Sequence, residues 1–321
     1  MKYYIGVDIG GTKCAATLGA EEDGSLSVLE KSSFSTFSEP YGVLERFEEE
    51  IRRLLQKREL TCRAVSALGI SCGGPLDAER GIVQSPPNLP NWDQIPVTDF
   101  FQKRLGIPSY LENDANACAV AEWKYGAGKG LKNVIFLTFG TGLGAGLILD
   151  GRLYGGTNCN AGEIGHVRLR RQGPVGYGKA GSAEGFCSGG GLAQQGRQAA
   201  LEHPDEAEAL IAFSGGVEQI TAKSIAQMAD RGDPLCKRIY AECGKMLGET
   251  LSVLVDLLNP QAIVLGGVFM RSHHLLREEM DRVIGAEALA VSAEACRILP
   301  SALGEQIGDY AALSLAAYHA E

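Results

Sequence analysis

The sequence predicts an α/β fold built from two related halves. Short apolar strands alternate with amphipathic helices along the 321 residues, which is the pattern of an α/β protein. Residues 7–12 (VDIGGT) align without a gap on residues 137–142 (LTFGTG), and each segment lies in a strand–turn–strand unit. The 42 glycines cluster at such turns. A match between two short glycine turns also arises by chance, so the repeat alone leaves a duplication open.

Each predicted element has a local justification. Strands are expected where short apolar runs meet glycine or polar residues, at 3–9, 13–18, 64–71, 107–111, 134–139, 143–149 and 262–266. Helices are expected where apolar residues recur every three or four positions, at 42–57, 115–125, 234–257 and 307–319. Asn259-Pro260 ends the third of these helices. We expect a smaller α/β domain of residues 1–115 plus about 305–321, and a larger α/β domain of about 116–304.

The composition excludes several classes of protein. Lys and Arg total 30 against 39 Asp and Glu, for a net charge of −9, which disfavours nucleic acid and anionic membrane surfaces as partners. The nine cysteines are scattered without a C-x-x-C pair, as reduced cytoplasmic thiols are. The opening residues MKYYIGVDI resemble a buried strand rather than a leader, and the longest uncharged run, 133–149, is short for a membrane span and broken by glycines. We therefore expect a cytoplasmic protein.

Both glycine turns have the composition of a phosphate cradle, in which backbone N–H groups and hydroxyls surround the anion. The first turn contains Asp8, Gly10, Gly11, Thr12 and Lys13; the second contains Thr138, Gly140, Thr141 and Gly142. The alternative is a pair of tight hairpins without a ligand. No P-loop motif is present, and a strand follows the second turn where a dinucleotide fingerprint requires a helix.

Asp114 is a candidate general base, because it lies where an apolar strand meets a helix. The same position suits an ordinary helix cap, and the sequence leaves both interpretations open.

A second polar group could bind a metal or sugar hydroxyls; it consists of Glu163, His166 and Glu184. Residues 69–73 (GISCG) fit the G-x-S-x-G hydrolase motif, but the proline at position 75 leaves no room for the helix that a nucleophile elbow requires.

Taken together, these residues resemble the ROK family of bacterial sugar kinases and regulators over essentially the whole chain. DIGGTK at 8–13 and LTFGTGLG at 137–144 look like the two phosphate motifs of the family, and Leu265-Gly266-Gly267 looks like its adenosine turn. The segments that resemble its sugar site occur in the family's order, at 73–75 (GGP), 87–89 (PNL), 112–114 (END) and 162–166 (GEIGH).

The resemblance implies an actin-like ATPase (ribonuclease H-like) fold, with two α/β domains around a central cleft. It implies transfer of the γ-phosphoryl of ATP to a hexose 6-hydroxyl, with Asp114 as the base and Asp8 orienting Mg²⁺ directly or through water. Sugar contacts are implied for Gly74, Asn88, Asn113, Glu163, His166 and Glu184, and nucleotide contacts for both turns and for Gly266 and Gly267. A homodimer is also implied. The sugar stays open among glucose, fructose, mannose, allose and the N-acetylated hexosamines, as does polyphosphate as the donor.

One departure from the family concerns zinc. The family usually carries C-x-C-G-x-x-G-C-x-E after the histidine, whereas this chain has Val175, Tyr177 and Ser182 at the cysteine positions. We expect no structural zinc and a loop held by packing of Val175 and Tyr177; a rearranged site using Cys159 and Cys187 is the alternative.

The alternative to a kinase within this resemblance is a sugar-sensing regulator. Its winged helix-turn-helix is not expected here, because the first strand begins at residue 3.

Overall fold

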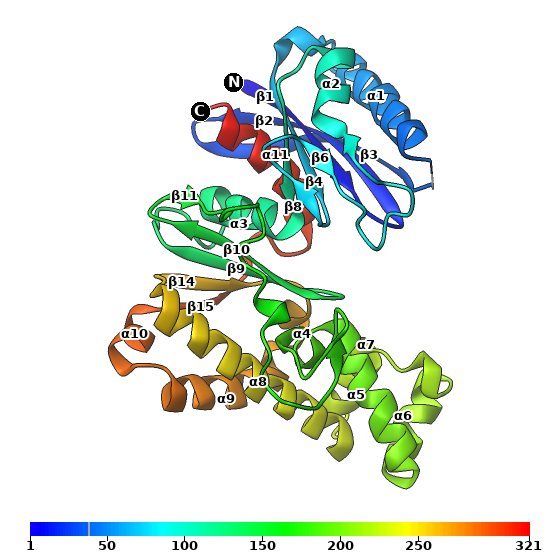
Figure 1. The fold of residues 1–321 in the computed structure, drawn as a ribbon, viewed down its shortest axis with the longest axis vertical. Coiled ribbons are helices and arrows are strands. Elements are labelled where there is room, and N and C mark those ends of the chain that lie inside the picture. Colours follow the sequence, from blue (N-terminus) through cyan, green and yellow to red (C-terminus); the bar gives the residue numbers. More distant parts are fainter. Residues whose placement is uncertain (38) are drawn as a thin grey trace. The chain divides into compact units, whose positions relative to one another are not determined.

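The computed structural model describes residues 1–37 and 39–321, which form two compact units (Figure 1). Unit 1 comprises Met1–Lys132, Gly146–Ala161 and Ala302–Glu321; unit 2 comprises Asn133–Ala145 and Gly162–Ser301. Unit 1 extends past residue 115 because helix α3 (Asp114–Tyr125) packs on the last helix, α11 (Ile307–His319). The domain boundaries given above stay a prediction.

Unit 1 is built on a five-stranded sheet with the order β3-β2-β1-β4-β8. Its strands are β1 (Lys2–Ile9), β2 (Lys13–Glu22), β3 (Ser25–Ser35), β4 (Val65–Cys72) and β8 (Ser109–Asn113). Strands β1, β2 and β3 are antiparallel neighbours, whereas β4 runs parallel to both β1 and β8. In this register Ile9 lies opposite Cys72, and Cys72 lies opposite Asn113. The ends of β1, β4 and β8 therefore lie at one edge of the sheet.

The two faces of this sheet bury different helices, as the two-residue period of a strand requires. Ile5 and Val7 of β1 belong to a core with α1 (Pro40–Lys57) and α2 (Val97–Leu105). Tyr4, on the opposite face, packs with residues of α11. The remaining short elements of this unit are η1 (Cys62–Ala64), β5 (Leu76–Asp77), β6 (Ile82–Val83), β7 (Ile95–Pro96), β11 (Arg152–Leu153) and η4 (Gly304–Gln306).

A second five-stranded sheet has the order β11-β10-β9-β14-β15. It contains β9 (Val134–Phe139), β10 (Leu143–Leu149), β14 (Ala262–Leu265) and β15 (Arg297–Pro300), and β14 runs parallel to both β9 and β15. Matching β1 with β9 and β2 with β10 makes the two strand orders coincide. The aligned segments 7–12 and 137–142 thus occupy equivalent hairpins, as the repeat in the sequence predicts.

The helices of unit 2 pack around its longest helix, α8 (Pro234–Leu258). Helix α9 (Val268–Glu287) packs along α8 and is kinked at Ser272 (Figure 1). The other elements are η2 (Ile164–His166), β12 (Val175–Gly176), β13 (Lys179–Ala180), α4 (Ala183–Phe186), α5 (Gly189–Glu202), α6 (Pro204–Ser214), η3 (Val217–Gln219), α7 (Ala222–Asp230) and α10 (Ala290–Ala295). Within residues 1–37 and 39–321, no helix combines the length and the apolar character needed to cross a bilayer.

Candidate functional site

In unit 1, the predicted site residues gather at the edge where β1, β4 and β8 end. Asp8 is the second-last residue of β1 and lies opposite Ser71 of β4, which in turn lies opposite Glu112 of β8. The turn 10–12 leaves this edge from β1, and Asp114 leaves it as the first residue of α3. Parallel strands thus bring together residues that are more than a hundred positions apart in sequence.

The start of α3 distinguishes the two interpretations of Asp114. Asn113 is the N-cap: its side-chain oxygen accepts a hydrogen bond from the N–H of Ala115 at 2.9 Å. Buried Glu112 accepts hydrogen bonds from the N–H of Asn113 and from the side chain of Asn116, both at 2.9 Å. Asp114 is therefore not the cap. It accepts a hydrogen bond from the N–H of Ala115 at 2.8 Å and keeps an exposed surface.

Two carboxylates influence each other at this edge. The surrounding protein displaces water from Asp8 and raises its pKa from 3.8 to about 6; the nearby negative charges of Asp114 and Asp309 add to the rise, and Lys31 opposes it. Loss of water also raises the pKa of Asp114, while hydrogen bonds from backbone N–H groups act in the opposite direction. A cation bound here would relieve this repulsion between like charges.

The first phosphate turn is braced by a residue that sequence reasoning missed. The hydroxyl of Thr36 donates to the carbonyl of Gly10 at 2.6 Å, and the N–H of Thr36 donates to the carbonyl of Thr12 at 3.0 Å. These bonds fix two carbonyls of the turn toward the segment that follows β3. A strand at Ser25–Ser35 was not predicted, so nothing in the sequence placed Thr36 beside the turn.

The sugar-site candidates of unit 1 lie against the same turn. A Cβ atom on Gly11 would lie 2.6 Å from the carbonyl oxygen of Asn88, so only glycine fits there. A Cβ on Gly74 would lie 3.4 Å from the amide nitrogen of Asn113.

The hydrolase interpretation of residues 69–73 does not fit the structure, because Ser71 is buried within β4 and the short strand β5 follows it instead of a helix.

In unit 2, the second phosphate turn is held by a helix and by Glu184. The first N–H groups of α5 donate to the turn: Gly189 to the carbonyl of Gly140 at 2.7 Å, and Gly190 to that of Thr141 at 3.1 Å. Glu184 accepts from the N–H of Leu143 at 3.0 Å, and a Cβ on Gly142 would lie 2.6 Å from its carboxylate. The hydroxyl of Thr138 accepts from the N–H of Gly144 at 3.0 Å. Thr138 and Glu184 thus shape the turn.

Glu163 immediately precedes the short helix η2 and His166 is the last residue of that helix; both are exposed. The ring of His166 lies edge-on to that of Tyr177, with 6.3 Å between the centroids.

The expectation that Val175 and Tyr177 hold the loop at 175–182 by packing is wrong, because these residues are 47% and 71% exposed. Ser182 holds it instead. It is fully buried, donates to the carbonyl of Gly176 at 3.4 Å and accepts from the N–H of Gly185 at 3.2 Å.

The predicted adenosine turn follows β14. Gly266 donates to the carbonyl of Leu137 at 3.0 Å, which ties the turn to β9. Gly267 has φ +61°, and a Cβ there would lie 2.0 Å from the carbonyl oxygen of Phe139. This position therefore requires glycine for both its conformation and the close approach. The adenosine turn and the second phosphate turn consequently lie at the same edge of the second sheet.

Zinc and magnesium ions require different sets of protein ligands. Throughout 1–37 and 39–321, no three His, Cys, Asp or Glu residues come together in a group that could hold a metal ion, the four-ligand zinc site of the family included. Mg²⁺ needs less from the protein, since it binds through one or two carboxylates, water and substrate phosphates. Asp8 beside Asp114 fits that requirement.

The chain is similar to known proteins over nearly its whole length. A model of the ROK family matches residues 4–318. The chain belongs to the ROK family. It is 36% identical to the glucokinase of Streptomyces coelicolor over 83% of this chain and 82% of that protein. The structure of a ROK glucokinase from Streptomyces griseus in complex with glucose and AMPPNP is similar, with a TM-score of 0.77, 32% identity, and coverage of 98% of this chain and 99% of that one.

Regulators also occur among the ROK relatives. The chain is 27% identical to the DNA-binding transcriptional repressor Mlc of Escherichia coli over 83% of this chain and 64% of that protein. The expected actin-like ATPase fold is confirmed by the ROK kinase structures. The glucokinase relatives support sugar phosphorylation and the use of ATP, and the repressors keep a regulatory role as its rival.

Proposed function

We propose that this protein is an ATP-dependent hexose kinase that phosphorylates the sugar 6-hydroxyl, with Asp114 as the general base. The observation that carries the proposal is the state of Asp114. It is an exposed carboxylate at the first turn of α3, it leaves the capping to Asn113, and it lies near Asp8, which leads into the first phosphate turn. A carboxylate placed in this way can accept a proton from a bound hydroxyl.

In the proposed reaction, Asp114 accepts the proton of the 6-hydroxyl as its oxygen attacks the γ-phosphorus. The bond between the γ-phosphorus and the bridging oxygen breaks, and ADP leaves with that electron pair. Such a transfer depends on positioning and charge neutralisation more than on covalent chemistry. Mg²⁺, when bound, supplies positive charge to the phosphates, and Asp8 would hold it. The turns 10–13 and 138–142 and the glycines at 266 and 267 would bind the nucleotide.

The sugar would be held by polar side chains that can accept from or donate to its hydroxyls. In unit 1, Asn88 and Asn113 are placed beside Gly11 and Gly74, and the amide nitrogen of Asn113 can donate because its oxygen caps α3. In unit 2, Glu163, His166 and Glu184 would accept from or donate to the remaining hydroxyls. Because the glucokinase of Streptomyces coelicolor is 36% identical, glucose is the first substrate to test.

The proposal is tested by coupled measurement of ADP release with glucose, mannose, fructose, allose, N-acetylmannosamine and N-acetylglucosamine. We expect one of these to support turnover, with one ADP and one sugar 6-phosphate formed per event. The 6-deoxy analogue of that sugar should bind competitively without turnover. A sugar that binds in calorimetry while neither ATP nor polyphosphate supports turnover with any hexose would favour the regulator instead.

A further inference from the structure

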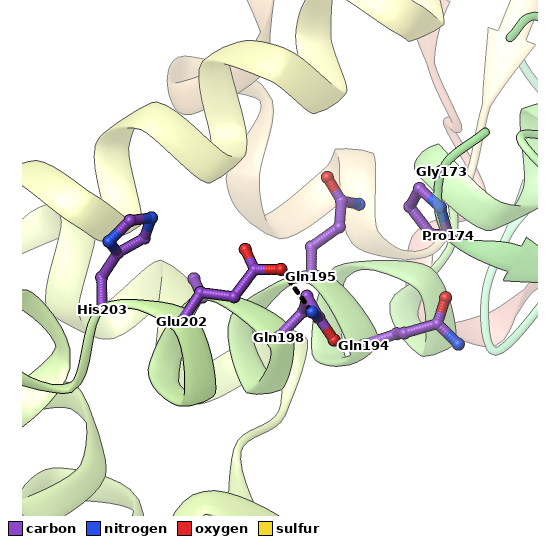
Figure 2. A pocket seen from close by; sticks show the side chains of 8 residues that line it. Gly173, Pro174, Gln194, Gln195, Gln198, Glu202 and His203 are labelled. Carbon is purple, nitrogen blue, oxygen red and sulfur yellow. Dashed lines mark hydrogen bonds between the residues drawn. The ribbon is translucent and has the colours of Figure 1, made fainter.

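Unit 2 contains a cavity that the proposed reaction does not use. It has a volume of about 420 Å³ and lies between one face of α5 and the loop at Gly173 and Pro174 (Figure 2). Pro174 lies at one end of the row of side chains and His203 at the other, with the glutamines of α5 between them. This volume falls in the range of small-molecule sites.

The lining side chains define the chemistry that the cavity can recognise. Three are carboxamides, from Gln194, Gln195 and Gln198, and the charged group is the carboxylate of Glu202, which accepts from Gln198 at 2.5 Å. None of the eight lining residues is Lys or Arg, and the exposed carboxylate of Glu202 would repel a phosphate or carboxylate ligand, with the imidazole of His203 at the far end of the row.

A hydroxylated ligand matches these groups, because a carboxamide offers both a donor and an acceptor, as a hydroxyl does. The bonds already present set the atoms that can face it. Gln195 uses its nitrogen to donate to the carbonyls of Phe186 and Gly191, at 3.2 and 3.3 Å, so its oxygen can accept. Gln194 uses its oxygen to accept from the N–H of Val175 at 2.5 Å, so its nitrogen can donate.

The cavity is also connected to the second phosphate turn. Helix α5, which supplies most of the lining, begins at Gly189 and Gly190, and the N–H groups of these residues donate to the turn at Gly140 and Thr141. A ligand that shifts or rigidifies α5 would therefore act on the carbonyls of the turn. The bond from Val175 to Gln194 gives a second connection, to the loop that leads into Glu184.

From these observations we propose that the cavity is a second site for a neutral, sugar-like polyhydroxylated ligand, and that its occupation regulates the binding of ATP. The regulatory part rests on the proposed kinase function, whereas the binding part does not. The free sugar should therefore bind here, and a sugar phosphate should not.

Binding is tested by equilibrium dialysis of the full chain with radiolabelled D-glucose in the absence of nucleotide. The variant Ala199→Trp fills the cavity from α5 and should lose one bound glucose per chain relative to the wild type. Ala226→Trp, at a half-buried alanine of α7 outside the cavity, is the matched control and should keep it. Equal numbers of bound glucose in the wild type and Ala199→Trp would overturn the proposal.

A milder pair of variants keeps the test valid if the tryptophan perturbs folding. Gln198→Ala should weaken the second site about 3- to 10-fold, the effect of losing one hydrogen bond, whereas Gln227→Ala on α7 should not. D-glucose 6-phosphate should fail to displace the glucose bound at this site. Displacement by the phosphate, or equal behaviour of the two glutamine variants, would contradict the assignment.

The regulatory part has its own readout. Occupation of the cavity should change the KM for ATP by about 5-fold or more, as allosteric couplings usually do, and the change should vanish in Ala199→Trp. A glucose site that is present but leaves the KM for ATP unaltered would refute the regulation and leave the binding site standing. Absence of all kinase activity would refute the proposed function, and the dialysis result would still decide the site.

Discussion

Replacing Asp8 by asparagine is expected to stabilise the ligand-free protein while it abolishes kinase activity. Loss of water and the charges of Asp114 and Asp309 raise the pKa of Asp8 from 3.8 to about 6. At 1.36 kcal/mol per pKa unit, the ionised carboxylate lowers the free energy of unfolding by about 3 kcal/mol at pH 7. Asparagine removes the charge, so Asp8→Asn should raise the free energy of unfolding at pH 7 by about 1–3 kcal/mol.

The pH dependence follows from the direction of the shift. A carboxyl whose pKa is raised by folding favours the folded state at low pH, and this contribution is lost as the pH rises from about 4 through about 6. The free energy of unfolding of Asp8→Asn should therefore exceed that of the wild type by about 3 kcal/mol or less at pH 7. At pH 4.5 this difference should shrink to about 1 kcal/mol.

Urea unfolding without nucleotide or Mg²⁺ at both pH values measures this difference. Asp99→Asn is the matched control, because Asp99 is exposed on α2 and pairs with Lys103 at 2.9 Å; its effect should stay within about 0.5 kcal/mol. If Asp8→Asn unfolds at the same urea concentration as the wild type at pH 7, or earlier, Asp8 does not carry the unfavourable charge inferred here.

Three further predictions concern the turns and the loop. Thr36→Val should raise the KM for ATP about 2- to 10-fold because the carbonyl of Gly10 loses a bond of 2.6 Å, and Thr36→Ser should restore it in steady-state kinetics. Gly267→Ala should lower the free energy of unfolding by about 1–3 kcal/mol more than Gly24→Ala, since both have positive φ but nothing lies within 4 Å of a Cβ at Gly24; equal urea midpoints would contradict the clash. Ser182→Ala should cost about 1–3 kcal/mol by leaving buried backbone groups unpaired, and metal analysis of the wild type should find far less than one zinc per chain.

The main strands and several helices could be predicted because their signals are local. The terminal helix at 307–319 was predicted with its observed bounds, and the helix predicted at 42–57 begins two residues earlier, with Pro40 in its first turn. The equivalence of the two hairpins was also readable, because glycine and threonine recur at matching positions. These features depend on neighbouring residues and not on the tertiary packing.

The features that were missed depend on distant partners or carry a misleading composition. Helix α5 begins with three glycines, which disfavour a helix in isolation, and its first turn is stabilised by the carbonyls of Gly140 and Thr141. The bracing role of Thr36 follows from the pairing of β2 with β3. At the lost cysteine positions, the sequence suggested packing by the large side chains, whereas the small Ser182 makes the bonds.

The central claim is that Asp114 accepts the proton of the sugar hydroxyl, and kinetics of Asp114→Asn test it most directly. Asparagine keeps the size of the side chain and an oxygen for the N–H of Ala115, and Asn113 still caps α3, so the fold and the sugar affinity should be retained. With the base removed, kcat in the coupled ADP-release assay should fall by at least ~10²-fold. Wild-type turnover by a folded Asp114→Asn protein that binds its sugar with unchanged affinity would contradict the mechanism.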